Sequence, residues 1–349
     1  MRLLTSVCSK LSGALSGKIP IQQKGGAGVL YLINSLGEIT ASEHFKLNKG
    51  EGLSVALGCF DGVHRGHQRL MESASAKQGL TPAVWTFSEP LTFPYIDNVA
   101  CRISAFGRHG IRLAVCESFA DVKTLTPEQF VMHLVKDYNV RHFVCGADFR
   151  YGINRSGWVE NLKTDAKKYG ATAEVIPPLM TDSFPSLNLS NEKISATLIR
   201  RLLALGDVER AHVLLGRPFE VKGHVIHGKG IGHVMNIPTV NQKMEDGRVM
   251  LRHGVYDTVT VIDGERYPSV TNFGLRPTVN ENQNDLTCET HVIGEALDLY
   301  GKSVTVEFYR FAREEKRFSS LDELKEAVLC DIKRAKGFFE DNQAVNKRR

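Results

Sequence analysis

The ten residues from Gly58 to His67 include the side chains of this chain that are best suited to phosphate chemistry, and they read G-C-F-D-G-V-H-R-G-H. They lie between a short apolar run at 53–57 and a helical pattern at 68–77. His64 and His67 fall three residues apart in the first turn of that helix, so both side chains point to the same side. The helix N-terminus adds free N–H groups and the positive end of a dipole. This arrangement predicts a cradle for a triphosphate with two imidazole donors.

Three glycines in this stretch fit the same interpretation. Gly58 and Gly62 permit a tight turn, and Gly66 lets a phosphate or a base approach the backbone. Taken alone, two histidines that cap a helix in a surface loop would explain an H-x-x-H pattern about equally well. A zinc site is a weaker third interpretation, because no further ligand follows at a typical spacing.

A second glycine-rich segment lies in the C-terminal half of the chain. Residues 227–232 read H-G-K-G-I-G, and residues 236–241 read N-I-P-T-V-N. A glycine-rich loop followed by P-T-x-N could fold over the phosphates of ATP, and its glycines are Gly228, Gly230 and Gly232. The Thr239 hydroxyl and the Asn241 amide oxygen are hard ligands of the kind that Mg²⁺ prefers. Without further information, a glycine hairpin followed by a Pro-Thr turn would be the favoured interpretation.

The composition is that of an ordinary globular protein. The chain has 349 residues, 42% of them hydrophobic and 24% charged, and this length suggests two domains. These values argue against long disorder, and a net charge of +5 suits small polyanions such as nucleotides better than nucleic acid. Every longer apolar stretch is broken by a charge or a glycine, so no membrane-spanning helix is expected.

The cysteines and the N-terminus bear on the compartment. The seven cysteines are odd in number and scattered, with no C-x-x-C pair, which argues against a disulfide framework or a structural zinc site. Residues 1–20 contain only a short, serine-interrupted apolar patch, which makes a poor signal peptide. We therefore expect a cytoplasmic protein. The oligomeric state cannot be read from the sequence.

The first motif lies in a region where strand and helix patterns alternate. Strands are expected at 53–57, 82–86, 111–116, 140–145 and 173–176, and helices at 68–77, 126–138 and 159–168. The second of these helices has a strong start, with Thr126 as N-cap, Pro127 next and Gln129 three residues after the cap. Such alternation predicts an α/β fold with a mostly parallel sheet covered by helices on both faces. Ligands of such folds bind beyond the carboxyl ends of the strands.

The pattern changes after a helical pair at 190–216, where we place the domain boundary. Residues 219–312 contain alternating, β-branched runs separated by turns such as Asp263-Gly264, which predicts an antiparallel barrel. A capping box at 320–323 then begins a helix that is expected to pack on the barrel. Before the α/β region, a glycine-rich joint at 25–28 precedes a strand candidate at 29–33.

The first motif resembles the nucleotidylyltransferase signature H-x-G-H in its extended form G-x-F-D-G-x-H-x-G-H. That form is typical of the N-terminal module of the bacterial bifunctional riboflavin kinase/FMN adenylyltransferase (FAD synthetase) family. The resemblance implies that Gly58, Phe60, Asp61 and Gly66 bind ATP and that His64 and His67 act on its phosphates. Asp61 is expected to orient the loop or the nucleotide rather than to transfer a proton.

Two further segments are similar to this family. Residues 145–152 resemble G-x-D-F-R-F-G, which implies that Asp148 and Phe149 border the flavin; a plain strand end and turn is the alternative. Residues 194–200 resemble I-S-S-T-x-I-R, which implies that Ser195 and Thr197 cap a helix and, with Arg200, face phosphate. An ordinary capped amphipathic helix is the alternative there.

The C-terminal half is similar to the riboflavin kinase module of the same family. Residues 227–241 resemble the family segment H-G-x-x-x-G-R-x-L-G-F-P-T-A-N. Four shorter family patterns follow: G-V-Y at 254–256, N-F-G-x-R-P-T at 272–278, E-x-H at 289–291 and L-Y-G-K at 299–302. The resemblance implies that Glu289 is the general base for the ribityl hydroxyl and that Asn272 binds ATP. An exposed strand carboxylate is the alternative for Glu289.

Several positions depart from the family pattern. In the kinase loop, His233 replaces an arginine, Asn236 a glycine and Ile237 a phenylalanine; in the first motif, Cys59 replaces an asparagine. Asparagine is the non-glycine residue that best tolerates a left-handed backbone, so the turn can survive. Loss of an arginine near phosphates is expected to weaken ATP binding or to change its pH dependence.

The resemblance implies four segments: an extension of unclear role at 1–50, an FMN adenylyltransferase domain at 51–216, a riboflavin kinase domain at 217–341 and a basic tail at 342–349. The expected activities are phosphorylation of riboflavin to FMN and adenylylation of FMN to FAD. ATP serves as co-substrate, Mg²⁺ as cofactor and FMN and FAD as substrate and product; no nucleic acid or membrane partner is implied. Alternatives are an FAD synthetase with an impaired kinase module and an inactive flavin-binding regulator. A generic cytidylyltransferase would explain H-x-G-H but not P-T-x-N.

Overall fold

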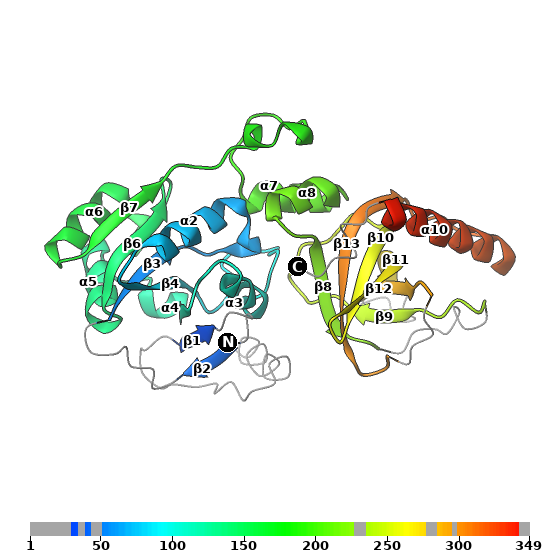
Figure 1. Ribbon diagram of the computed structural model, residues 1–349, viewed down its shortest axis with the longest axis horizontal. Coiled ribbons are helices and arrows are strands. Elements are labelled where there is room, and N and C mark those ends of the chain that lie inside the picture. Colours follow the sequence, from blue (N-terminus) through cyan, green and yellow to red (C-terminus); the bar gives the residue numbers. More distant parts are fainter. Residues whose placement is uncertain are drawn as a thin grey trace. The chain divides into compact units, whose positions relative to one another are not determined.

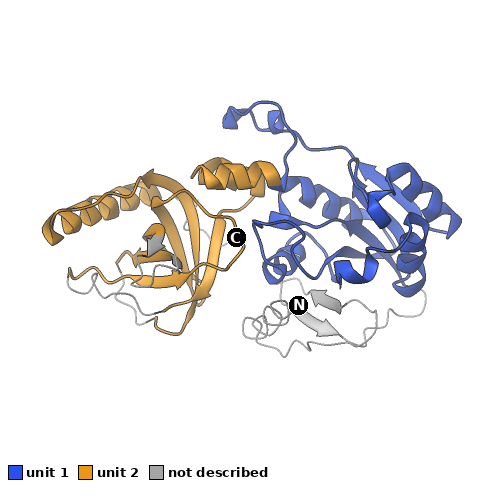
Figure 2. Cartoon of the chain, turned by 180° about the vertical axis from the view of Figure 1, so that it is seen from behind, with its two compact units in different colours: residues 1–196 blue, residues 197–349 orange. Residues whose placement is uncertain are grey.

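The chain folds as two compact units, residues 1–196 and 197–349 (Figure 2). The computed structural model describes residues 29–33, 39–42, 51–226, 235–276, 285–294 and 299–341. Each unit is built on its own sheet (Figure 1). Among the described residues, no helix combines the length and the apolar character needed to cross a bilayer.

The first unit is the predicted α/β fold. Its seven-stranded sheet has the order β2-β1-β5-β4-β3-β6-β7, and the five strands from β3 to β7 are parallel. The strands are β1 (Val29–Ile33), β2 (Ile39–Ser42), β3 (Gly52–Leu57), β4 (Leu80–Phe87), β5 (Leu113–Glu117), β6 (Val140–Gly146) and β7 (Thr172–Ile176). The five parallel strands correspond to the five predicted ones.

Helices cover both faces of this sheet, as predicted. They are α2 (Arg65–Ala76), α3 (Val99–Gly107), α4 (Phe119–Val122), α5 (Pro127–Asp137) and α6 (Val159–Lys168). One buried cluster joins α2 and α3 to side chains such as Ala56 and Val84, while a second joins α5 and α6 to Val55 and Phe143. Burial of apolar side chains on both faces explains why the strands read as continuous hydrophobic runs.

The start of α5 confirms the capping prediction. The Thr126 hydroxyl accepts a hydrogen bond from the Gln129 N–H at 3.2 Å, and the Gln129 side chain accepts one from the Thr126 N–H at 2.9 Å. Pro127 occupies the first helical position, where no N–H is needed. Local sequence therefore determines where this helix begins.

The strand predicted at 29–33 is β1, and it joins the same sheet. It pairs antiparallel with β5, with Val29 opposite Cys116, and β2 pairs with its other edge. This part of the N-terminal extension therefore covers the edge of β5. The glycine-rich joint at 25–28 lies outside the described residues.

The second unit begins with two helices, α7 (Ala196–Ala204) and α8 (Val208–Leu215), and continues as the predicted antiparallel barrel. The strand order is β8-β13-β10-β11-β12-β9. The strands are β8 (Phe219–His224), β9 (Val240–Lys243), β10 (Gly254–Ile262), β11 (Glu265–Arg276), β12 (Asp285–Val292) and β13 (Ser303–Arg313). The Ile226 N–H donates to the Asn241 carbonyl at 2.8 Å and so links the two outer strands.

The last helix, α10 (Leu321–Asp341), packs on the barrel as expected. Its Ala335 and Phe339 are buried against Val255 and Val270 of the barrel. Buried Asp257 of β10 also forms ion pairs with Arg310 of β13, at 2.5 Å, and with Arg334 of α10, at 3.0 Å. An apolar contact and a charged contact therefore hold this helix to the sheet.

The division into compact units falls earlier than the boundary that we predicted at 216. The helical pair belongs to the second unit, because α8 packs against β13 and β8. Its buried residues Ala211, Leu214 and Leu215 provide that contact face. The helical pattern alone does not show which sheet will cover the apolar face of a helix.

Candidate active sites

His64 and His67 lie together at the N-terminus of α2. His64 is the N-cap residue, and its Nδ1 accepts a hydrogen bond from the His67 N–H at 3.3 Å. The two rings stack, with centroids 3.6 Å apart and planes inclined by 17°. Both imidazoles therefore lie at the carboxyl end of β3, beside the free N–H groups of the first helical turn.

Gly66 has a packing role that the sequence did not reveal. A Cβ at this position would lie 3.2 Å from two atoms of the His64 ring and 3.5 Å from the Ile194 carbonyl oxygen. The space that a side chain would need is therefore already occupied by His64. This close approach helps to explain a glycine between the two histidines.

The loop between β3 and α2 has an unusual backbone. Phe60, Gly62 and Val63 have φ values of 53°, 76° and 42°. A left-handed conformation is rare for a β-branched residue such as Val63, and strain of this kind concentrates at functional sites. Buried Phe60 contacts the ring of His67 edge-on at 5.1 Å, and a Cβ at Gly58 would lie 3.1 Å from the Phe60 ring.

Asp61 holds a neighbouring loop in place. Its Oδ1 accepts hydrogen bonds from the N–H groups of Ile96 at 2.8 Å and Asp97 at 3.1 Å. These contacts join the loop after β3 to the loop after β4. They agree with the expectation that this carboxylate orients a loop rather than transferring a proton.

The two histidines are held neutral. Burial, followed by the charge of Lys193, lowers the pKa of His64 to about 3. Burial and the neighbouring His64 lower the pKa of His67 well below its ordinary value. The rings therefore act at neutral pH as hydrogen-bonding groups and not as cations. They can position phosphates, but their share in neutralising phosphate charge is smaller than the motif alone suggests.

Lys193 is a site residue that the sequence analysis missed. Its ammonium group forms an ion pair with Asp148, and its charge affects both histidines. Burial raises the pKa of Asp148, but the Lys193 contact and the charge of Arg155 outweigh it, so the net shift is downward. Lys193 and the segment after β6 that contains Asp148 thus meet close to the histidines. Lys193 directly precedes the I-S-x-T stretch, which is the only local signal that could have identified it.

The other predicted residues lie in the segment after β6, directly before α7 or within α7. Phe149 packs against the core and stacks on Tyr151, with ring centroids 5.6 Å apart. Ser195 directly precedes α7, whereas Thr197 is the second residue of that helix and its hydroxyl accepts a hydrogen bond from Arg200 at 3.2 Å. Thr197 is therefore not an N-cap, which corrects that part of the prediction.

In the second unit, three candidate residues occupy one row of the barrel. Asn241 of β9 lies directly opposite Glu289 of β12, and Glu289 lies directly opposite Asn272 of β11. Residues paired in this way have side chains on the same face of the sheet. Their chain neighbours Gln242, Cys288 and Phe273 form the adjacent row and are completely buried. The register therefore brings together three predicted kinase residues from distant parts of the sequence.

Asn241 has the properties of a metal ligand. The residue is only 3% exposed, and its buried Oδ1 has no hydrogen-bond partner among the residues that the structure describes. An unpaired buried amide oxygen is costly unless a ligand satisfies it. Thr239, two residues earlier and partly buried, adds a hydroxyl. These residues fit a hard cation such as Mg²⁺.

The turn before Thr239 keeps the backbone that the family pattern requires. Asn236 has a φ of 58°, so the asparagine adopts the left-handed conformation expected for it. The His291 ring contacts the Pro238 carbonyl oxygen at 2.8 Å and anchors this turn to β12. Asn272 donates to the Glu315 carboxylate at 3.1 Å, a partner that the sequence analysis did not include. The predictions for Gly228, Gly230, Gly232 and His233 concern residues outside the described ranges.

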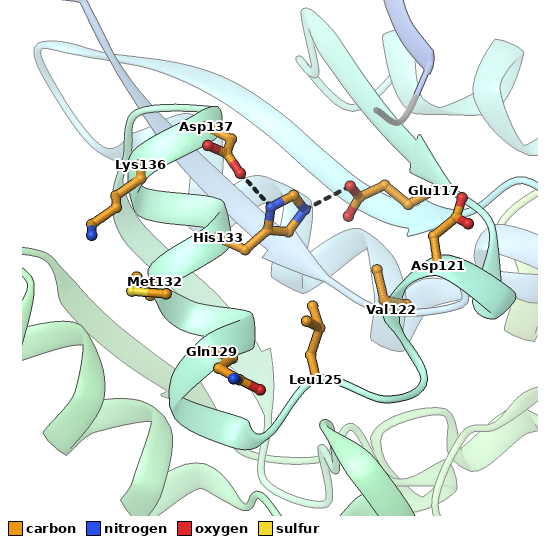
Figure 3. Close-up of a pocket in the computed structure, with 9 residues that line it drawn as sticks. All are labelled: Glu117, Asp121, Val122, Leu125, Gln129, Met132, His133, Lys136 and Asp137. Atoms are coloured by element: carbon orange, nitrogen blue, oxygen red, sulfur yellow. Dashed lines mark hydrogen bonds and ion pairs between the residues drawn. The ribbon is translucent and has the colours of Figure 1, made fainter. Parts of the chain in front are cut away.

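A separate cavity of about 370 Å³ lies between the end of β5 and helices α4 and α5 (Figure 3). His133 lies between Glu117, at 2.7 Å, and Asp137, at 2.5 Å. Trp85 and Tyr138 also donate hydrogen bonds to Glu117. None of these residues belongs to the predicted sites, and the cluster ties β5 to α5.

The comparisons with known proteins agree with the motif assignments. Residues 46–186 match the family model described as FAD synthetase, and residues 215–339 match the one described as riboflavin kinase. The helical pair from α7 to α8 falls almost entirely between these two matches.

Similar proteins named bifunctional riboflavin kinase/FMN adenylyltransferase occur in several bacteria. The relative from Pseudomonas fluorescens is 34% identical and the alignment covers 82% of this chain and 92% of the relative. The relative from Bacillus subtilis is 32% identical, and the alignment covers 85% of this chain and 96% of the relative. The relative from Escherichia coli K12 is 33% identical, and the alignment covers 83% of this chain and 93% of the relative. A crystal structure described as a macrolide-efflux protein from Streptococcus pneumoniae has 27% identity and a TM-score of 0.73, over 83% of this chain and 96% of that one.

Proposed function

Because the chain belongs to the family of bifunctional riboflavin kinases/FMN adenylyltransferases, we propose that it makes FAD from riboflavin in two steps. The second unit transfers the γ-phosphoryl group of ATP to riboflavin and yields FMN and ADP. The first unit transfers the adenylyl group of a second ATP to FMN and yields FAD and pyrophosphate. Both reactions use ATP, which is consistent with a cytoplasmic enzyme.

In adenylyl transfer, an oxygen of the FMN phosphate attacks the α-phosphorus of ATP while the bond to the β-phosphate oxygen breaks. The nucleophile is already an anion, so the protein needs no strong general base. Its task is to position the reactants and to stabilise charge on the phosphates. Neutral His64 and His67, with the N–H groups at the start of α2, hydrogen-bond the phosphates of ATP. Lys193 adds positive charge near them.

The neighbouring groups complete the nucleotide site. Gly58, Phe60 and Asp61 shape the loop that receives ATP, and Gly66 keeps the His64 ring in its place. Asp148 and Phe149 border the flavin. Ser195, Thr197 and Arg200 remain predicted phosphate ligands from the I-S-x-T-x-I-R resemblance.

In the kinase reaction, Glu289 accepts the proton of the ribityl 5′-hydroxyl as its oxygen attacks the γ-phosphorus of ATP. The row Asn241–Glu289–Asn272 supports this role, because it places the carboxylate between two polar side chains at one surface of the sheet. Thr239 and Asn241 would hold Mg²⁺. When bound, the ion neutralises charge on the phosphates of ATP. Asn272 and the glycine-rich loop bind ATP.

The observation that supports the adenylyltransferase function best is the stacked pair His64 and His67 at the N-terminus of α2. The test is a chromatographic product assay with the full chain, ATP, Mg²⁺ and either riboflavin or FMN. We expect FAD from both substrates, with FMN as an intermediate from riboflavin. FAD from FMN alone would support an impaired kinase module. Flavin binding without any product would support the regulatory alternative and contradict the proposal.

Two variants distinguish the two sites in the same assay. His67→Ala should abolish FAD formation and leave FMN formation intact. Glu289→Gln should lower FMN formation by about 100-fold or more, because a general base contributes 10²- to 10⁴-fold, and should leave adenylylation of added FMN intact. Equal loss of both activities in either variant would contradict the assignment of two separate sites.

A further inference from the structure

The loop between β6 and α6 is built as a short, rigid hairpin. Tyr151 and Gly157 pair through two backbone hydrogen bonds, at 3.2 and 2.9 Å. A Cβ at Gly152 would lie 2.8 Å from the Pro127 nitrogen, and a Cβ at Gly157 would lie 2.9 Å from the Pro127 side chain. Both glycines therefore let the hairpin press against the start of α5. This packing fixes the position of the hairpin tip.

Arg155 lies at this tip in an unfavourable backbone conformation. Its φ is 56°, directly after Asn154 at 53°. Asparagine tolerates the left-handed region, whereas arginine gains nothing there that offsets its steric cost. The side chain is exposed, and its guanidinium makes no hydrogen bond or ion pair with the part of the chain that the structure describes. The described part of the fold thus holds the Arg155 side chain on a strained backbone and gives its guanidinium no hydrogen-bond or ion-pair partner.

The hairpin faces the adenylyltransferase site. β6 is the parallel neighbour of β3, so the Asp148 segment and the Gly58–His64 loop leave the sheet at the same edge. The charge of Arg155 reaches groups on both loops. Burial raises the pKa of Asp148, whereas the Lys193 contact and, to a smaller extent, the charge of Arg155 lower it. The charge of Arg155 also opposes the rise in the pKa of Cys59 that desolvation causes.

The site needs a cation of this kind. A phosphomonoester such as FMN has about −1.5 to −2 charge at pH 7. His64 and His67 are neutral, and the charge of Lys193 is paired with Asp148. The guanidinium of Arg102 is buried and donates to the carbonyl oxygens of Cys59 and Phe87. Each of these groups is therefore neutral or already has a protein partner, whereas Arg155 has none among the described residues.

We propose that Arg155 binds the phosphate of FMN through its guanidinium fork and thereby selects FMN over riboflavin at the first unit. The inference rests on the adenylyltransferase function proposed above. The hairpin continues the Asp148–Phe149 segment, which borders the flavin in that proposal. The phosphate of FMN is therefore a better candidate for the ligand of Arg155 than the phosphates of ATP. Arginine suits this task because its fork can donate two parallel hydrogen bonds to one phosphate. Arg155 would hold the nucleophile in place and take no proton.

The test measures FAD formation by the full chain as FMN, ATP and riboflavin are varied. Arg155→Asn should raise the KM for FMN about 10- to 100-fold, as expected for loss of a charged hydrogen bond, and change the KM for ATP less than twofold. Riboflavin lacks the phosphate, so its Ki as a competitor of FMN should not change. This Ki is measured with the parent chain and the Arg155→Asn variant when both also carry Glu289→Gln, because that substitution suppresses the conversion of riboflavin to FMN. Arg112→Gln is the matched control: Arg112 is exposed and precedes β5, at the opposite end of the parallel strands. This variant should keep the parent KM for FMN.

A stability measurement separates binding from a structural role. Asparagine tolerates the left-handed backbone, so Arg155→Asn should unfold at the parent temperature or above it. A lower unfolding temperature together with a higher KM would indicate a structural residue and overturn the inference. An unchanged KM for FMN, or a rise in the KM for ATP alone, would overturn it as well. A parent chain that forms no FAD from FMN would overturn the proposed function, and this inference with it.

Discussion

The imidazole rings of His64 and His67 stack with their centroids 3.6 Å apart, and the Nδ1 of His64 accepts a hydrogen bond from the backbone N–H of His67. Two rings this close and this buried cannot both take a proton without strong repulsion. Burial also lowers the pKa of each ring, so both histidines are neutral at neutral pH. Positive charge that the protein itself brings to this site therefore comes from lysine and arginine side chains around the rings.

The first prediction concerns the pH dependence of adenylyl transfer. Because the pKa of His64 is about 3 and that of His67 is also far below its usual value, neither ring changes its charge between pH 6.5 and 8.5. The rate of FAD formation at saturating ATP and FMN should therefore not change between pH 6.5 and 8.5 through titration of either histidine. If an imidazolium were required, the rate would instead fall about tenfold per pH unit above its pKa.

The second prediction uses Gly66. Gly66→Ala places a methyl group 3.2 Å from the His64 ring, so the ring must move, and FAD formation should fall at least about tenfold, the cost of a misplaced catalytic group. FMN formation should not change. The control is Gly337→Ala, because a Cβ at Gly337 has no described residue within 4 Å. Full FAD formation by Gly66→Ala would contradict the proposed position of the His64 ring.

The third prediction concerns the unpaired oxygen of Asn241. Asn241→Ala should raise the Mg²⁺ concentration needed for FMN formation about tenfold or more, the effect of one lost ligand contact. The removed Oδ1 makes no hydrogen bond with the described part of the chain, so the free energy of unfolding of the second unit should fall by only about 1 kcal/mol. Titration of the kinase reaction with Mg²⁺, beside calorimetric unfolding, measures both effects.

The adjacent Gln242 provides the contrast for that experiment. Its Oε1 also has no hydrogen-bond partner among the described residues, but its side chain lies on the other face of the sheet from Asn241 and Glu289. Its Nε2 donates to the carbonyl oxygens of Gly223 and Val304, both at 3.0 Å, and the residue is completely buried. Gln242→Ala should therefore lower the free energy of unfolding by about 2 kcal/mol with an unchanged Mg²⁺ requirement. A greater effect of Gln242→Ala than of Asn241→Ala on that requirement would argue against Asn241 as a ligand.

The fourth prediction concerns the cluster in Figure 3. The contact with Glu117 raises the pKa of His133, which hydrogen-bonds both Glu117 and Asp137 when protonated. A raised pKa stabilises the folded chain below the unfolded value of about 6.5, and this stabilisation is lost as the pH rises through the folded pKa. His133→Gln should therefore cost about 1–3 kcal/mol at pH 6 and less at pH 9.

The two tryptophans of the chain, Trp85 and Trp158, both lie in the first unit, so their fluorescence follows its unfolding in urea. Lys168→Gln is a suitable control, because it removes an exposed ion pair with Glu128 on the same unit and such pairs contribute little. An equal loss of stability at both pH values would show that His133 acts only through packing.

The sequence by itself determined the five parallel strands, the start of α5, the antiparallel barrel and the two motifs. The capping box at Thr126, the apolar runs of the parallel strands and the G-x-F-D-G-x-H-x-G-H stretch are signals between residues close along the chain. Their physics is local, because a cap or a strand period depends on neighbouring residues. The strand at 29–33 and the left-handed Asn236 followed from the same kind of reasoning.

Tertiary structure alone decided which of these residues meet. The row Asn241–Glu289–Asn272 depends on the register of three strands, the pair Asp148–Lys193 joins two loops, and β1 reaches the edge of β5. The same holds for the neutral state of His64, which comes from burial, and for the helices that belong to the barrel rather than to the α/β unit. Register, burial and helix packing arise from contacts between segments far apart in the chain, and no local pattern encodes them.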